Sequence, residues 1–162
     1  MKTVTKTVDN LAKVAAGIRL LAETRVMVGF PQDADKPRKD GEPINNATLG
    51  YIHDNGAPEA GIPARPFMRP GIKDSATEVQ RRFKLAGKAA LDAKPDSAMR
   101  QMEAAGMIAA SAVKARINSN IQPALADSTL AARKRRGVKR TNTLVDTGQM
   151  RNAVTYVVRK VK

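Results

Sequence analysis

Apolar residues recur at helical spacing in three stretches of the chain, and each stretch predicts a long helix. In residues 5–24 the recurring positions are Val8, Leu11, Ala12, Ala15, Ile18 and Leu21 or Ala22. After Pro70 they are Ile72, Ala76, Val79, Phe83, Ala86 and Ala90. In residues 96–118 they are Ala98, Met102, Ala105, Ala109, Ala112 or Val113, and Ile117. The small residues of the third stripe, together with Gly106, predict a very close approach between helices.

Two shorter segments have the alternation of β-strands. Residues 25–30 form a β-type run, and in residues 153–161 Val154, Tyr156 and Val158 share one face. Because these segments lie near the two ends of the chain, we predict a small antiparallel sheet packed with two or three long helices. The fold class is therefore α+β, in a single domain that spans residues 1–162.

Shorter elements and loops fill the rest of the chain. Residues 47–54 predict one or two helical turns that end at Asn55-Gly56, and residues 128–136 predict a short helix with Ser128 as its cap. Charge, proline and glycine predict exposed loops. These loops lie near residues 32–46, 55–70 and 119–145.

A stiff segment at residues 61–70 contains three prolines within eight residues. Proline fixes φ, removes a backbone donor and keeps the preceding residue out of the α region. We therefore predict an extended proline-rich arm that docks onto a neighbouring subunit through Phe67 and Met68. The candidate docking residues are Ile62, Pro63, Arg65, Pro66, Phe67, Met68 and Arg69.

A second candidate docking segment precedes the last predicted strand. Its residues are Leu144, Asp146, Thr147, Gly148, Met150 and Arg151. Asp146 or Thr147 can accept hydrogen bonds from backbone N–H groups two or three residues on, and Gly148 permits an unusual φ. An ordinary turn that feeds the last strand is the alternative interpretation.

The composition narrows the function classes. The 162 residues include no cysteine and no tryptophan, which excludes disulfides and cysteine-based zinc sites. No run of about 18 apolar residues and no signal-peptide pattern occurs, so we expect a soluble chain made in the cytoplasm, with no membrane partner.

The formal net charge of +14 predicts a polyanionic partner such as nucleic acid or an acidic protein surface. The densest basic run supplies the candidate contacts with DNA or another polyanion: Arg133, Lys134, Arg135, Arg136, Lys139 and Arg140. Without interleaved aromatic residues or a helix-turn-helix pattern, such a run would bind phosphates without sequence specificity. A solvated loop with no specific partner is the alternative.

The sequence carries no pattern of an enzyme. It has no nucleophile motif, phosphate-binding loop or dinucleotide turn, and we expect no cofactor and no metal. His53 beside Asp54 is too small a set for zinc, so we expect His53 to have a structural role near the Asn55-Gly56 turn. A metal-dependent nuclease built on His53, Asp54 and Asp146 is the least favoured hypothesis.

The order of these segments resembles the head–tail connector family of long-tailed double-stranded-DNA bacteriophages and prophages, the neck or tail-completion proteins. Residues 25–31 are similar to the family's Val-x-Val-Gly-like strand end, and the family's Ile-Pro-Ala-Arg-Pro-Phe segment is complete at residues 62–67. Ser128-Thr129, the basic run and residues 144–151 follow in the family's order. Residues 53–55 depart from it, since an acidic–aromatic pair is more usual there. The closing segment also resembles a sibling group, the virion-morphogenesis proteins of contractile-tailed phages.

The resemblance implies a non-enzymatic structural protein of the virion, made in the host cytoplasm and placed at the head–tail junction. It implies a homo-oligomeric ring around the DNA channel, with a hexamer favoured, although twelve copies would fit a neck next to the portal. The implied partners are head-completion, tail-terminator or tail-tube proteins and, non-specifically, genomic DNA. The alternative function is that of a small basic nucleic-acid-binding protein without sequence specificity.

Overall fold

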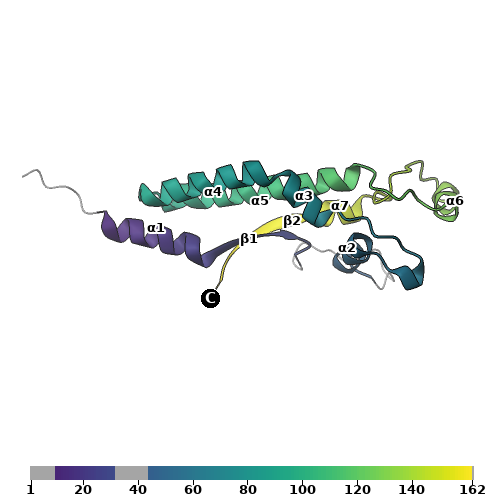
Figure 1. Ribbon diagram of the computed structural model, residues 1–162, viewed down its shortest axis with the longest axis horizontal. Coiled ribbons are helices and arrows are strands. Elements are labelled where there is room, and N and C mark those ends of the chain that lie inside the picture. Colours follow the sequence, from purple (N-terminus) through teal and green to yellow (C-terminus); the bar gives the residue numbers. More distant parts are fainter. Residues whose placement is uncertain (1–9, 32–43, 162) are drawn as a thin grey trace, which may run out of the picture.

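The chain forms an elongated α+β structure in a computed structural model that describes residues 10–31 and 44–161 (Figure 1). The described elements are α1 (Leu11–Glu23), β1 (Thr24–Gly29), α2 (Asn46–Asn55), the 3-10 helix η1 (Pro58–Ala60), α3 (Met68–Asp74), α4 (Ala76–Leu91), α5 (Pro95–Asn118), α6 (Asp127–Arg135), α7 (Gln149–Ala153) and β2 (Thr155–Lys160). This arrangement confirms the predicted fold class. The start of the first predicted helix at residues 5–9 and most of the first loop, residues 32–43, lie outside the described residues.

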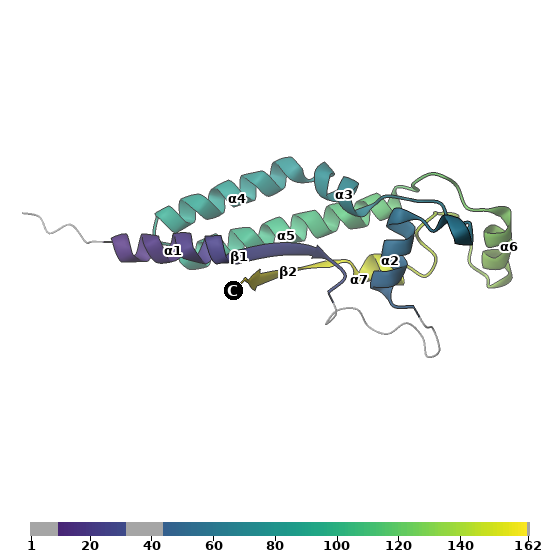
Figure 2. The same cartoon turned by 60° about the horizontal axis from the view of Figure 1, so that its bottom comes forward.

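The sheet consists of β1 and β2, which pair antiparallel with Thr24 opposite Lys160 and Gly29 opposite Thr155. Its inner face covers α5, so that α4, α5 and the sheet form successive layers (Figure 2). Gly106 of α5 faces Val26 and the Tyr156 ring, which leave no room for a side chain at that position. The predicted helix–helix contact at this glycine is therefore wrong, because the space that it opens admits a strand.

The helices α4 and α5 form a hairpin in which the predicted apolar stripe is buried along α5 but only partly along α4. All of the buried α5 residues lie on or beside the predicted stripe: Ala98, Met102, Ala105, Gly106, Ala109, Ala110, Val113 and Ile117. In α4 the buried residues are Ala86, Ala89 and Ala90, whereas Phe83 is 42% exposed. The hairpin thus buries small side chains, which allows the two helices to pack closely.

The first helix presents a different face from the predicted one. α1 contacts α4 at Gly17, where an added Cβ would lie 3.0 Å from the carbonyl oxygen of Ala90. Leu11 and Ile18, two residues of the predicted stripe, are 73% and 50% exposed. The prediction is wrong here because backbone contact at a glycine, rather than apolar area, sets the rotation of this helix.

Helix α3 replaces the end of the predicted arm. Met68 begins the helix, and Pro70 lies in its first turn, where the missing N–H has no intrahelical acceptor to lose. Gly71 then lets α3 approach the backbone of Val113 in α5. Residues 63–67 of the proline segment lie outside any helix, strand or bridge.

A hydrophobic core separate from the small side chains buried between α4 and α5 lies between the two ends of the molecule, around Phe67. It consists of Phe67, Val113, Ile117, Leu144, Val145, Met150 and Val154. Phe67 is fully buried and meets Phe30 edge to face, with ring centroids 6.4 Å apart and planes at 84°. This cluster joins the proline segment to the helices and to the C-terminal segment.

Candidate functional site

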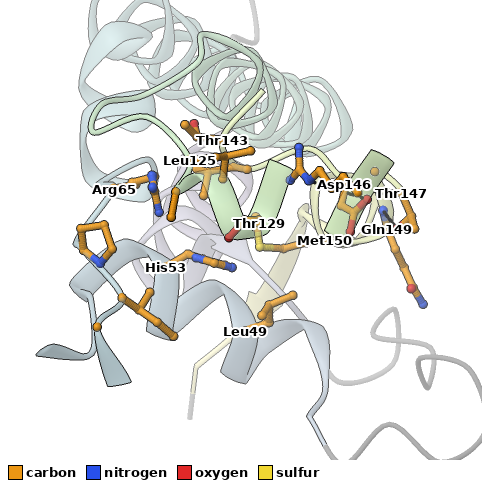
Figure 3. Close-up of a pocket in the computed structure, with 17 residues that line it drawn as sticks. Leu49, His53, Arg65, Leu125, Thr129, Thr143, Asp146, Thr147, Gln149 and Met150 are labelled. Atoms are coloured by element: carbon orange, nitrogen blue, oxygen red, sulfur yellow. Dashed lines mark hydrogen bonds and ion pairs between the residues drawn. The ribbon is translucent and has the colours of Figure 1, made fainter. Parts of the chain in front are cut away.

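The three segments singled out by the sequence converge on one partly open cavity of about 400 Å³ (Figure 3). The proline segment contributes Ile62, Pro63 and Arg65, the basic run contributes Arg133, and the second segment contributes Leu144, Asp146, Thr147, Gly148 and Met150. Much of the remaining wall comes from Leu49 and His53 of α2, from Leu125 just before α6, and from Thr129 within α6. We call this space the Arg65 cavity.

Arg65 is a structural residue of the monomer as well as a wall of the cavity. Its side chain is 4% exposed; Nε donates to the carbonyl of Pro123 at 2.8 Å and Nη2 to that of Ala124 at 3.0 Å. Its backbone N–H donates to the carbonyl of His53. Burial lowers the pKa of Arg65 from its ordinary value, since among the described residues no carboxylate lies within ion-pair distance of it.

Asp54 holds the start of α3, a role that the sequence analysis missed. Its Oδ1 accepts hydrogen bonds from the N–H groups of Phe67 and Met68, at 2.7 and 2.9 Å. A carboxylate at a helix N-terminus satisfies donors that have no intrahelical partner and complements the helix dipole. The signal was not visible in the sequence because Asp54 lies 14 residues before Met68, the first residue of the helix.

The predicted docking role of Phe67 requires correction. We expected this side chain to be free for a neighbouring subunit, but it is fully buried in the core of its own chain. Met68 also packs against that core, and Ile62 bonds back to Ala57 through both of its backbone groups. Of the predicted arm, Pro63, Pro66 and Arg69 remain exposed.

The second docking segment is likewise partly internal. Leu144 and Met150 are about 5–6% exposed and belong to the same core, so they are not free anchors for a partner. Arg151 donates to Asn118 Oδ1 at the end of α5. The segment does not feed β2 directly, because α7 intervenes.

The predicted turn chemistry of this segment is present. Gly148 has φ of 85°, a left-handed conformation that glycine adopts without strain, and it precedes the first residue of α7. The N–H of Gln149 donates to Thr147 Oγ1 at 3.3 Å. These features close the turn that brings Asp146 to the wall of the cavity.

The basic run divides into internal and external residues. Arg133 is 5% exposed; its Nη1 donates to the carbonyls of Arg140 and Asn142, and its Nε lies 3.9 Å from Asp146. Arg136 forms an ion pair with Asp146 at 2.8 Å. The predicted role of Arg133 as a contact with DNA is therefore wrong, because its side chain is buried and bonded within the chain.

The remaining cations of the run are exposed on and beside α6, at the opposite end of the molecule from α1 (Figure 1). Lys134, Arg135 and Lys139 have neither a hydrogen bond nor an ion pair from their side chains to the rest of the described chain. Arg140 is exposed and donates to the backbone carbonyl of Asp146. The helix starts at Asp127 rather than after a Ser128 cap, because Ala126 holds the capping position.

The residues of the nuclease hypothesis do not form one cluster. His53 and Asp146 line the Arg65 cavity, but the Asp54 carboxylate is turned to the start of α3. Within the described part of the chain, no three His, Asp or Glu side chains gather where they would hold a metal ion. The observed bonding of Asp54 thus favours a structural role for this part of α2.

Comparison of the chain with models of known protein families, with characterised proteins and with solved structures finds no match in any of the three. None of the helices in residues 10–31 and 44–161 has the length and apolar content needed to cross a membrane.

Proposed function

We propose that this chain is a structural protein of the phage head–tail junction, a neck or tail-completion protein. It assembles as a ring, with six copies favoured, that joins or completes the tail and surrounds the DNA channel. The single observation that carries the proposal is an incomplete sheet. Within the described residues, β1 and β2 pair only with each other, so the outer edge of each strand lacks a partner strand.

An incomplete sheet favours assembly with another chain. Two-stranded sheets have little stability alone, and unpaired strand edges are templates for strands of other proteins. In a closed ring each subunit uses two different surfaces, one toward each neighbour. The outer edges of β1 and β2 are two such surfaces on opposite sides of one sheet.

The outer face of the sheet and the α1 end of the molecule also expose apolar side chains. Met27, whose neighbour Val26 faces α5, is 44% exposed on the outer face. Leu11 and Ile18 of α1 and Leu91 at the end of α4 are at least half exposed. Apolar residues gathered in this way are typical of surfaces that contact other proteins.

The exposed cations on and beside α6 support contact with DNA in both candidate functions. Diffuse attraction to phosphates suits a channel through which DNA must slide, because it carries no sequence preference. The alternative, a small nucleic-acid-binding protein, predicts tight binding of a DNA duplex by the free monomer. The connector function predicts weak binding by the monomer and stable contacts with other virion proteins.

Salt dependence separates these two functions. Replacing Lys134, Arg135 and Lys139 by Gln removes about 2.7 from the slope of log K against log salt if all three contact phosphate. Arg136→Gln is the matched control, because this side chain is paired with Asp146. A slope that is already close to zero in the unmodified monomer would exclude the nucleic-acid-binding alternative.

The direct test is electron microscopy of particles from a phage or prophage in which this gene carries an early stop codon. DNA-filled heads beside separate finished tails would support a joining role, and tails of uncontrolled length would support a role in ending the tail tube. Normal infectious virions would refute the proposal.

A substitution on the sheet tests the assembly mode. Met27→Lys should abolish the ring in light-scattering measurements and leave the circular dichroism unchanged, because the side chain is already in solvent. Met107→Lys on α5, with 57% exposure, is the matched control. A ring that persists in Met27→Lys would exclude the outer face of the sheet as the contact.

A further inference from the structure

The Arg65 cavity holds a buried cation whose charge is not balanced. Arg65 is 4% exposed, and its hydrogen-bond acceptors in the described chain are two neutral carbonyls. A buried charge without a counter-charge has lost its hydration and gained little in exchange. An anion placed beside this guanidinium would therefore gain more than one beside a surface arginine.

One nitrogen of this guanidinium is available to a ligand. Nε and Nη2 are bonded to carbonyls, whereas Nη1 has no acceptor in the described chain and is not among its fully buried polar atoms. Figure 3 shows the guanidinium directed into the space that His53 and Thr129 also border. Thr129 is an exposed residue of this wall, and its hydroxyl is a second potential donor.

The charged groups of the wall favour an anionic ligand. These groups are Arg65, Arg133 and Asp146, so two cations and one carboxylate leave a net charge of +1. Asp146 lies 3.9 Å from Arg133 and also pairs with Arg136, outside the wall, at 2.8 Å. Arg65 has no carboxylate within ion-pair distance in the described chain, so its charge is the uncompensated one.

Apolar side chains form a substantial part of the uncharged wall. They include Leu49, Ile62, Pro63, Leu125, Leu144 and Met150. An anion attached to an apolar group therefore matches more of the wall than a free anion does. A duplex is too wide to carry a backbone phosphate into a cavity of about 400 Å³, whereas a single side chain of a protein fits.

We propose that the Arg65 cavity binds a carboxylate of a partner protein, carried by a Glu or Asp side chain that is flanked by an apolar residue. The carboxylate accepts a charge-assisted hydrogen bond from Nη1 of Arg65, and the apolar neighbour packs on Leu125 and Met150. The identity of the partner as a neighbouring virion protein rests on the proposed function. The preference of the cavity for a carboxylate rests only on the residues that line it.

Ligand-observed saturation-transfer NMR on the full chain tests the proposal with two capped tripeptides, acetyl-Leu-Glu-Leu-amide and acetyl-Leu-Gln-Leu-amide. The two differ by one charge at nearly constant shape. We expect the Glu peptide to bind at least about tenfold more tightly, as hydrogen bonds to charged groups exceed neutral ones by roughly that factor. Equal binding of the two peptides, or binding of neither, would overturn the proposal.

A matched pair of variants locates the site without removing Arg65, whose own bonds hold the chain together. Leu125 lies beside Arg65 in Figure 3 and follows Ala124, which accepts a bond from Nη2. Leu125→Glu places a carboxylate of the protein itself in the cavity and should reduce binding of the Glu peptide about tenfold, whereas Leu125→Gln should reduce it much less. Equal binding by the two variants would show that the peptide occupies another place.

Competition identifies the source of the anion. Inorganic phosphate or a short DNA duplex that displaces the Glu peptide at lower concentration than free glutamate does would assign the cavity to phosphate and overturn the carboxylate proposal. The peptide experiments and the stop-codon experiment test different proposals. If the Glu and Gln peptides bind equally, the carboxylate proposal fails and the connector proposal stands. If virions lacking this protein are normal, the connector proposal fails and a preference for the Glu peptide stands.

Discussion

Replacing Phe67 by Ala should destabilise the isolated chain strongly. The side chain is fully buried, and truncation of a buried Phe to Ala costs about 3–5 kcal/mol of unfolding free energy. That sum includes the edge-to-face contact with Phe30, which contributes about 0.5–1.5 kcal/mol. With a urea dependence of about 2 kcal/mol per molar, a loss of about 4 kcal/mol lowers the unfolding midpoint by about 2 M.

Far-UV circular dichroism in urea measures this change, since the chain has no tryptophan to report by fluorescence. Phe83→Ala is the control: at 42% exposure, it should change the free energy of unfolding by less than about 1 kcal/mol. A Phe67→Ala chain with an unchanged midpoint but no self-association would refute the core assignment and return Phe67 to a docking role.

Three further substitutions test the local packing. Gly71→Ala places a methyl group 2.7 Å from Cα of Val113 and should cost about 1–3 kcal/mol in urea unfolding, whereas Gly87→Ala, with no atom within 4 Å, should stabilise α4 by about 0.5–1 kcal/mol. A Gly71→Ala chain more stable than the Gly87→Ala chain would contradict the close approach of α3 to α5. Asp54→Ala should cost about 1 kcal/mol and speed hydrogen exchange at the first amides of α3, because it removes the acceptor Oδ1, and unchanged exchange would exclude the cap. Gly148→Ala should lower thermal stability by about 1–2 kcal/mol because of its positive φ, and no loss would contradict that backbone geometry.

Residues that obey a simple period were predictable from the sequence. The stripe of α5 and the inward faces of β1 and β2 follow directly from apolar spacing, because burial on one side imposes that spacing. The rotation of α1 did not follow, since its contact is made by Gly17, which has no apolar side chain to reveal it.

The candidate site was predictable by segment but not by role. Proline chemistry correctly identified a segment outside regular structure at residues 63–67, but a local backbone rule cannot show that Phe67 packs inside its own chain. The sequence predicts a surface position for Arg133, whose buried location could not be foreseen because its acceptors are carbonyls, and carbonyls carry no sequence signal. The convergence of the three segments depends on contacts between residues nearly 60 or more positions apart, as in the bond between Arg65 and Pro123.

The pairing of Thr24 with Lys160 has a consequence for biosynthesis. A nascent chain can form the helical hairpin early, from residues close together in sequence, but β1 has to wait for nearly all of the chain before β2 exists to pair with it. A chain released before β2 is made would therefore leave Gly106 without the Tyr156 ring and the inner edge of β1 unpaired. Closure of the sheet thus makes a subunit that contains β2 distinguishable from one that ends before it, before any assembly begins.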